Sequence, residues 1–351
     1  MLNTVAVLDP AKTNLPLFLG WFIHTGITCL VFEMLDRSLH QLLLEREAEP
    51  LSLHEIRPIA QQLLTALHAL KSIGVVHSDL KPDNIMLANH GEEPFRVKLI
   101  DFGGSFSTSE DVHGCLIQPL GYRAPEVTLG LPISEAIDAW GLGCLLVWLR
   151  RASHPFSIRC EYQSMKDIVR IIGQPPGHMI KAGSYSKKYF LMNQHWLQPA
   201  MRLKTEKEYE RDTGIKPLVC TRSLDRLNDL ITLDEEMLSI ELDDQIEFVR
   251  FLKSLLQTDP VKRITPREAL RLPFITMAHL EDELDTSEYV KESFRKMLVC
   301  PTKESEEEQP SENETLADKP PDRCPRLTAG LKRIRKFFGR VMRVCLCCKN
   351  S

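Results

Sequence analysis

The sequence predicts an α/β fold of the α+β type, in which helices predominate and a small β-rich part comes first. Residues 17–33 are rich in β-branched and aromatic side chains, as strands are. From residue 52 onward, apolar residues recur at helical spacing as far as Gly74. Between residues 77 and 103, short polar stretches alternate with apolar ones that fit paired strands. The expected elements therefore follow one another as strands, a long helix and polar loops, and the interpretation of the chain starts from this order.

Three polar motifs follow the long helix. They read His77-Ser78-Asp79-Leu80-Lys81-Pro82-Asp83-Asn84, then Asp101-Phe102-Gly103, then Ala124-Pro125-Glu126. A turn-rich hairpin with scattered acids would explain any one of them, but not three in register with strands at 85–87 and 97–100 between the first two. In this order and spacing they resemble the signature of protein kinases. The resemblance implies a protein-kinase-like fold, mostly its helical C-terminal lobe, with a stub of the N-terminal β-lobe.

The residue types in these motifs suit phosphoryl transfer, which requires positioning and charge neutralisation. Asp79 is expected to orient the acceptor hydroxyl and take its proton, with Lys81 placing a positive charge beside the moving phosphoryl group. Asn84 and Asp101 offer the hard oxygen ligands that Mg²⁺ prefers. The expected cofactors are therefore ATP and Mg²⁺. Ser78 stands where many kinases carry an Arg that holds a phosphorylated activation loop, which argues against control by that route.

Residues 1–35 are expected to form a partial upper lobe ending in a hinge. Phe32, Glu33 and Leu35 resemble the hinge that meets adenine, and Met86 is expected to bind the nucleotide with them. No Gly-rich loop and no strand lysine precede these residues, and Thr4 stands where a lysine-pairing Glu is expected. The sequence therefore predicts an upper lobe truncated at its N-terminal end.

Five further residues are expected to hold the lobe together, on the same resemblance. Phe102 is expected to pack under His77, and Asp138 to brace the catalytic loop from below. Arg263 is expected to be buried against Glu126.

A narrower resemblance, to the homeodomain-interacting protein kinases, covers roughly residues 15 to 280. The stretches that carry it are Thr28–Leu35, Leu129–Pro132, Glu135–Asp138, Arg202–Thr205, Tyr209–Glu210, Thr213–Lys216, Arg263–Pro266 and Pro273–Met277. It implies a C-lobe at 36–280 with a group-specific insert at about 155–245. It also implies a Ser/Thr protein kinase that acts on proteins, mainly regulators of transcription. Leu116 stands where the group carries its self-activating Tyr, and Leu120 where it carries an Arg that contacts substrate.

Composition limits the other function classes. The 351 residues carry 44 basic and 48 acidic side chains, a net charge of −4, which gives no overall nucleic-acid-binding character. No apolar run approaches the 18 or so residues of a membrane span. The ten Cys are scattered except near the end, which favours a reducing cytoplasmic or nuclear location.

The C-terminal part changes character twice. Residues 281–326 are expected to be an acidic disordered linker, most clearly from 301, where acids and prolines replace apolar side chains. Residues 327–351 carry seven basic and no acidic side chains, so the rest of the chain carries −11 (−4 − 7). Apolar residues recur there at offsets of three and four, which predicts a basic amphipathic helix.

The tail allows several interpretations. A peripheral membrane anchor acylated at Cys345, Cys347 or Cys348 is preferred, because two weak membrane signals together give stable attachment. A helix docked on the kinase lobe, a nuclear-import signal and a zinc site are the alternatives. For the whole chain, the hypotheses are an active kinase, a pseudokinase scaffold and a membrane-tethered adaptor. The joint presence of Asp79 and Lys81 with both predicted metal ligands favours the first.

Overall fold

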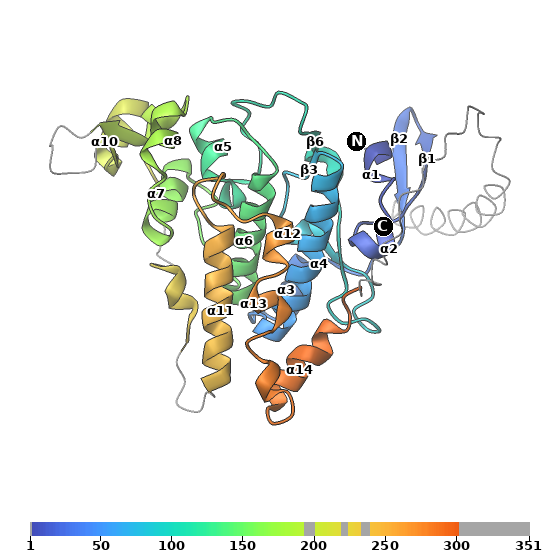
Figure 1. Cartoon of the computed structure of the whole chain (residues 1–351). Coiled ribbons are helices and arrows are strands. Elements are labelled where there is room, and N and C mark those ends of the chain that lie inside the picture. The colour runs from blue at the N-terminus through green and yellow to red at the C-terminus, as the bar shows by residue number, and fades with distance from the viewer. Residues whose placement is uncertain (1, 193–200, 219–223, 233–238, 302–351) are drawn as a thin grey trace, which may run out of the picture. The chain divides into compact units, whose positions relative to one another are not determined.

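The N-terminal part contains the predicted hairpin. Strands β1 (Phe18–His24) and β2 (Ile27–Phe32) pair antiparallel, and Figure 1 shows them beside the short helices α1 (Leu2–Val5) and α2 (Pro10–Thr13). Thr25 and Gly26 connect the strands with φ of 48° and 80°, the left-handed conformation that two-residue hairpins need. Several apolar side chains of the hairpin remain exposed, Trp21 at 64%. An isolated two-stranded sheet is only marginally stable, so the hairpin depends for its stability on its attachment to the hinge.

The computed structural model describes residues 2–192, 201–218, 224–232 and 239–301. Residues 1–302 form one unit, and the predicted tail with Cys345, Cys347 and Cys348 lies outside the described residues. The helices of the C-lobe core are α3 (Leu39–Glu45), α4 (Leu53–Ser72), α5 (Pro125–Leu129), α6 (Ala136–Arg151), α11 (Ser239–Leu255), α12 (Pro266–Ala269) and α13 (Pro273–Thr276). Among the described residues, no helix is both long and apolar enough to cross a membrane.

Helix α4 forms the centre of this core and delivers the chain into the first polar motif. Its predicted capping box is present, because Glu55 reaches back to the Ser52 backbone N–H at 2.9 Å. The helix ends before Gly74, whose φ of 68° suits glycine best. Ile59 and Leu63 on one face are fully buried, and α6 packs against α4. The apolar stripe read from the sequence is thus the face that meets the core.

Two small sheets and three short 3₁₀ turns set the polar loops at the end of α4. Strand β4 (Ile85–Leu87) pairs with β5 (Val97–Leu99), and β3 (Val75–Val76) pairs with β6 (Phe106–Ser107). The turns are η1 (Pro82–Asn84), η2 (Phe102–Gly104) and η3 (Leu120–Tyr122). The first pair places the first two polar motifs side by side, as the sequence predicts.

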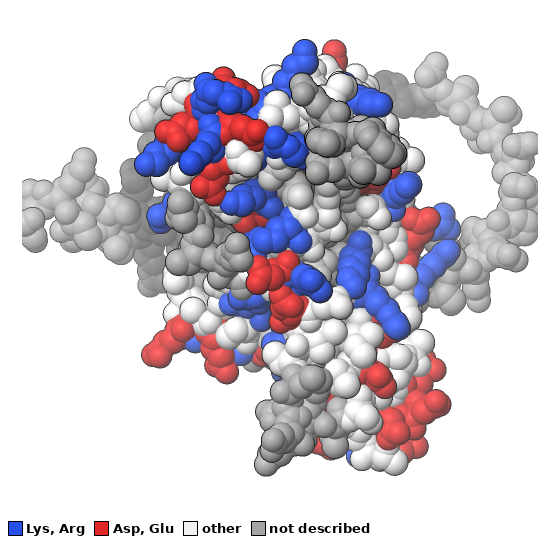
Figure 2. All heavy atoms as spheres, turned by 90° about the vertical axis from the view of Figure 1, so that its left-hand side faces the viewer, with Lys and Arg blue, Asp and Glu red and all other residues white. Residues whose placement is uncertain are grey.

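The predicted insert folds around a second apolar core. Its elements are α7 (Glu161–Ile171), α8 (Gly177–Ala182), α9 (Ser186–Tyr189), β7 (Phe190–Met192), β8 (Met201–Leu203), α10 (Glu206–Thr213) and η4 (Leu227–Leu230). Tyr162, Met165 and Tyr209 are buried in this second core. Figure 2 faces this end of the unit and shows acidic and basic side chains mixed over it, in line with ion pairs such as Lys166–Glu206.

The expected linker at 281–326 is wrong for its first part. Residues 281–301 fold as η5 (Glu281–Glu283) and α14 (Glu288–Met297), and α14 packs against α4. Val290 is fully buried and Tyr289 donates a hydrogen bond to the buried Asp244 at 2.6 Å. The charged residues of this helix lie on its exposed face, and because they dominate the composition, the segment was predicted to be a disordered linker. The linker from 302 onward lies outside the described residues.

Candidate active site

The first polar motif brings the two predicted catalytic residues together. Lys81 Nζ lies 2.8 Å from Asp79 Oδ2, and the Asn84 amide donates to the same oxygen and to the Asp79 carbonyl, each at 2.8 Å. The Asp79 side chain is 22% exposed and that of Lys81 31%, so both remain open to a substrate. The three side chains therefore form one polar cluster with Asp79 at its centre.

Asp138 fixes the loop from below, as predicted. Its carboxylate accepts the backbone N–H groups of His77 at 2.7 Å and Ser78 at 2.8 Å. Burial raises the pKa of Asp138 to about 7, although the two N–H donors act in the opposite direction. Ser78 has a φ of 65°, a left-handed conformation that costs free energy in a non-glycine residue. The two hydrogen bonds hold the loop in that conformation.

His77 and Phe102 connect the first motif to the second. Their rings meet edge to face with centroids 5.2 Å apart, as predicted. His77 Nε2 lies 3.0 Å from the Ile100 carbonyl, and burial lowers the pKa of His77 to about 4. The imidazole is therefore neutral at pH 7, and it serves as a packing and hydrogen-bonding group beneath the loop.

A cavity of about 700 Å³ opens between the hinge and the polar motifs. Its lining includes all six residues predicted to meet nucleotide or metal: Phe32, Glu33, Leu35, Met86, Asn84 and Asp101. Pro16, Leu30, Met34, Ile100, Phe102 and Gly103 complete the described lining. The volume lies within the usual range of small-molecule sites, and apolar walls with a few polar groups at one end are typical of them.

The hinge is held by contacts that the sequence alone did not predict. The Glu33 carboxylate pairs with Lys98 and accepts the Leu17 backbone N–H at 2.6 Å, while the Glu33 N–H donates to the Leu17 carbonyl at 3.0 Å. The Asp36 N–H donates to the Leu87 carbonyl at 2.9 Å. The charged Glu33 side chain is thus turned into the structure and does not compete for a ligand in the cavity.

Asn84 and Asp101 fit a Mg²⁺ ion that keeps most of its ligands from water and nucleotide phosphates. Both line the cavity, and Asp101 Oδ1 also accepts the Gly103 N–H at 3.1 Å, which fixes its side chain. Among the described residues, no group of three or more His, Cys, Asp or Glu side chains could hold a metal alone. The donor set is therefore suited to an ion delivered with a phosphate ligand.

The cavity lacks one feature that phosphates favour. None of the described residues that line it is Lys or Arg. Lys81 supplies a nearby positive charge from the first polar motif, but the strand lysine that kinases use to hold phosphates has no counterpart in the described lining. Within the described lining, the polar end of the cavity thus carries carboxylate and amide oxygens but no cation of its own.

The third motif is locked by a buried ion pair. Arg263 Nη1 lies 2.6 Å from Glu126 Oε1, and Nη2 lies 2.9 Å from Oε2, a bidentate arrangement. Arg263 also donates to the Ala136 and Gln257 carbonyls and lies over the Trp140 ring at 5.2 Å. The predicted pairing is confirmed, and it joins the segment after the activation loop to the core helices.

The activation segment differs from the pattern of a phosphorylation-controlled kinase. The Ser78 hydroxyl donates to the Gly104 carbonyl at 2.7 Å, and the Ser105 hydroxyl donates to the His77 carbonyl at 3.2 Å. Leu116 is exposed, while Gln118 bonds the Ala124 N–H at 2.9 Å and the Ile137 carbonyl at 3.0 Å. Serine hydroxyls therefore hold the first end of the segment, and Gln118 with the Arg123 guanidinium, which donates to the Ile117 and Gln118 carbonyls, holds the second. Gln118 belongs to no motif or periodic pattern that would have identified it.

Comparison with known proteins agrees with this geometry. The model of the protein kinase domain matches residues 12–275. The chain belongs to the protein kinase family. The match ends before α14, so the C-terminal helix that packs on α4 lies beyond the shared domain of the kinases.

The similar proteins carry the group name that the sequence predicted. The chain is 40% identical over 286 residues to homeodomain-interacting protein kinase 2 of Mus musculus, a match that covers 80% of this chain and 24% of that protein. It is 37% identical over 295 residues to homeodomain-interacting protein kinase 1 of Caenorhabditis elegans, covering 80% and 35%. It is 33% identical over 315 residues to homeodomain-interacting protein kinase 4 of Homo sapiens, covering 84% and 50%. The chain thus spans from a quarter to half of the length of these relatives.

Proposed function

We propose that this chain is a Ser/Thr protein kinase domain that transfers the γ-phosphoryl group of ATP to protein hydroxyls. The observation that carries the proposal is the convergence of Asp79, Lys81 and Asn84 in one hydrogen-bonded cluster, with Asn84 shared with the 700 Å³ cavity. Asp101 lines the same cavity from the second motif. A chain that served only as a scaffold would have no chemical need for this set.

In this proposal each residue has one task. Asp79 accepts the proton of the acceptor hydroxyl and orients its oxygen toward the phosphoryl group. Lys81, 2.8 Å from Asp79, stabilises the charge that develops during transfer. Asn84 and Asp101 hold Mg²⁺, which neutralises charge on the phosphates when it is bound. The Glu33 carbonyl and the Leu35 backbone groups meet adenine, with Phe32 and Met86 on the cavity walls.

We expect the purified 351-residue chain to transfer phosphate slowly, because the cavity lining described above contains no Lys or Arg. The measurement is incorporation of labelled phosphate from ATP into matched peptides that differ only in Ser, Thr or Tyr at the acceptor position. Ser and Thr peptides should be labelled and the Tyr peptide should not. Chelation of divalent metal should stop the reaction.

Asp79→Asn is the control, because it keeps the side-chain size and removes the base. It should abolish the remaining incorporation, since a general base contributes about 10²–10⁴-fold. Equal rates for Asp79→Asn and the parent would overturn the assignment. If the parent binds ATP but incorporates no labelled phosphate into any peptide, the pseudokinase alternative is favoured instead.

For partners, we propose protein substrates that include transcriptional regulators. The relatives are named for interaction with homeodomain proteins, and this part of the proposal rests on that similarity. The described part of the chain gives no independent observation on substrate identity.

For location, we propose that residues 327–351 hold the chain at a membrane surface from the cytoplasmic side. The support is the sequence of this segment, with seven basic residues, an apolar stripe and Cys345, Cys347 and Cys348. Changing all three Cys to Ser should release the chain from the membrane fraction, and Arg335→Glu with Arg340→Glu should weaken the first attachment in a salt-dependent way. Imaging of tagged chains measures both. If the triple Cys variant distributes as the parent does, or the parent is wholly nuclear, the basic residues are better explained as an import signal.

A further inference from the structure

The middle of the activation segment has few anchors. Thr108 is fixed by its N–H bond to the Gly74 carbonyl at 2.9 Å, and Ile117 by the Arg123 side chain at 3.1 Å. Residues 109–116 between them are mostly exposed, and their remaining hydrogen bonds join near neighbours, such as His113 N–H to Asp111 at 3.1 Å. Among the described residues, one hydrogen bond ties this stretch to another part of the chain.

That bond comes from Tyr185 in the insert. The Tyr185 hydroxyl donates to the Gly114 carbonyl at 2.9 Å, across 71 residues of sequence. The ring lies against Gly130, where an added Cβ would come within 2.7 Å of Tyr185 Cδ2. The Tyr185 N–H donates to the Leu129 carbonyl at 2.9 Å. Ring and backbone are thus seated on the end of α5, and the hydroxyl extends to the activation segment.

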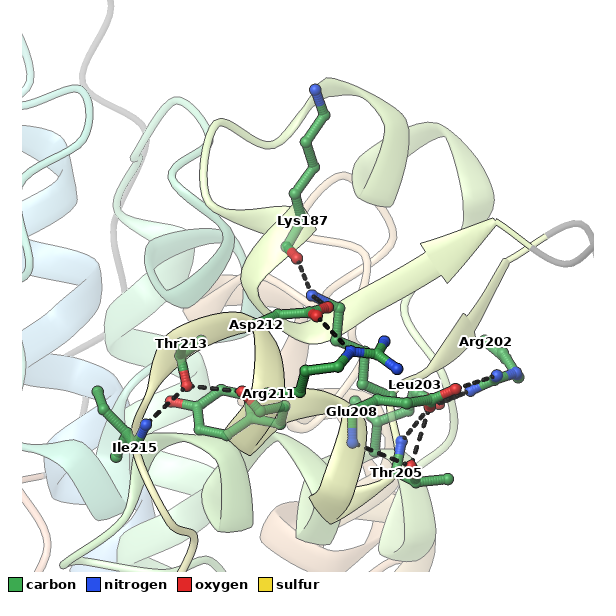
Figure 3. Close-up of polar contacts among 11 residues, drawn as sticks. Lys187, Arg202, Leu203, Thr205, Glu208, Arg211, Asp212, Thr213 and Ile215 are labelled. Carbon is green, nitrogen blue, oxygen red and sulfur yellow. Dashed lines mark hydrogen bonds and ion pairs between the residues drawn. The ribbon is translucent and has the colours of Figure 1, made fainter.

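The insert that carries Tyr185 is itself well fixed. Figure 3 shows the polar contacts that follow it, with Lys187, Arg202, Glu208 and Asp212 labelled. Lys204 donates to the Lys187 carbonyl at 2.6 Å and pairs with Asp212 at 2.9 Å. Arg202 forms a bidentate pair with Glu208, at 2.8 and 2.7 Å. Lys204 is 5% exposed, so its two bonds hold α9 and α10 together in a protected place. A hydroxyl on such a platform can restrain a loop whose own contact with the core is the half-buried Val112.

We propose that Tyr185 is a positioning residue that holds the activation segment in its ordered conformation through the Gly114 carbonyl. The proposal rests on the proposed kinase function and adds how the segment is ordered in this chain. Ser78 provides no cation for a phosphate, and Leu116 provides no hydroxyl to phosphorylate. The Tyr185 bond orders the activation segment without a phosphate. The conformation of the segment is therefore set by the insert and not by phosphorylation.

We call the bond from the Tyr185 hydroxyl to the Gly114 carbonyl the Tyr185 latch. Amide hydrogen exchange tests this latch without requiring catalytic activity. Tyr185→Phe removes only the hydroxyl and leaves the ring on Gly130. One neutral hydrogen bond changes an opening equilibrium by about threefold to tenfold, so the hydrogen-bonded amides of this stretch, those of Glu110, His113 and Cys115, should exchange faster by that factor. Exchange in α4 and α6 should not change.

Tyr162→Phe is the matched control, because it removes another hydroxyl-to-carbonyl bond of the insert, from Tyr162 to Lys204 at 2.5 Å. It should leave exchange of residues 109–116 as in the parent. Gly130→Ala displaces the Tyr185 ring and should reproduce the Tyr185→Phe effect. Unchanged exchange of residues 109–116 in Tyr185→Phe would overturn the proposal, as would an equal increase in the Tyr162→Phe control.

A kinetic measurement separates this proposal from the proposed function. If the chain phosphorylates peptides, Tyr185→Phe should raise KM for the peptide about threefold to tenfold and leave KM for ATP unchanged, since the segment borders the acceptor side. An unchanged peptide KM would show that the latch does not reach substrate binding. If the parent chain shows no transfer, the exchange result still decides the latch, and only the kinase function fails.

Discussion

Arg263→Ala is expected to lower the free energy of unfolding by about 3–5 kcal/mol, because it leaves the Glu126 carboxylate buried without its partner. Both side chains are essentially inaccessible, with 0% of Arg263 and 1% of Glu126 exposed. The change also removes bonds to the Ala136 and Gln257 carbonyls. Urea denaturation followed by circular dichroism measures the loss.

Two further variants test the reason for that loss. Glu126→Ala should be destabilising to a similar degree, but the double variant should cost clearly less than the sum, because no charge then remains unpaired. Arg250→Ala removes an exposed Arg, paired with Glu247 on α11, and should change stability by less than about 1 kcal/mol. Additive losses in the double variant would show that Arg263 and Glu126 stabilise the fold through separate contacts.

The parts of the fold that sequence reasoning found are those governed by local rules. Ser52 with Glu55 and Thr265 with Glu268 are capping boxes, and each begins a helix where the pattern predicts one. The turn at Thr25-Gly26 likewise requires only its two residues. Such signals are complete within four or five residues, so they survive without any knowledge of the neighbouring elements.

The contacts of the site were predicted through the kinase resemblance, and not through local rules. Nothing in the local sequence connects Glu126 with Arg263, 137 residues apart, or Asp138 with His77, 61 residues apart. The order of the three motifs made these pairings predictable. The positions of Glu33, Leu35 and Met86 on the cavity wall follow from the same order.

The C-terminal helix α14 could not be predicted because its anchor is a polar network distributed over four elements. Arg57 of α4 pairs with Asp244 of α11, and Asp244 also bonds His279 at 2.9 Å and Tyr289 at 2.6 Å. Burial alone would raise the pKa of Asp244, but the bonds from His279, Arg57 and Tyr289 outweigh it and lower that pKa. Stability from this network is therefore present at neutral pH and is lost as the pH falls through the folded-state pKa. A sequence pattern shows only scattered charges there.

The Tyr185 latch was missed for a related reason. An exposed Tyr in a lysine-rich stretch, Ser184 to Lys188, carries no periodic or motif signal. Its role depends on Gly130 and Gly114, which lie next to Tyr185 only because the insert folds back onto the end of α5. Side chains that act on the carbonyl of a distant glycine are recognisable only in three dimensions.

Asp138→Ala is expected to separate the support of the catalytic loop from the stability of the lobe. The His77 and Ser78 N–H groups would lose their buried acceptor, which costs about 1–3 kcal/mol for each unsatisfied donor. Because Asp79 follows directly, a shift of the loop by about 1 Å would lower the transfer rate of the folded protein about 100-fold.

The matched control is Asp167→Ala, which removes a carboxylate that is also buried and accepts a backbone N–H, from Ser157 at 3.1 Å, but lies in the insert. It should lose stability while its rate per folded molecule stays close to that of the parent. Hydrogen exchange at the His77 and Ser78 amides should rise in Asp138→Ala alone. If the two variants instead lose the same fraction of their rate, or exchange at these amides is unchanged, Asp138 stabilises the lobe without positioning Asp79.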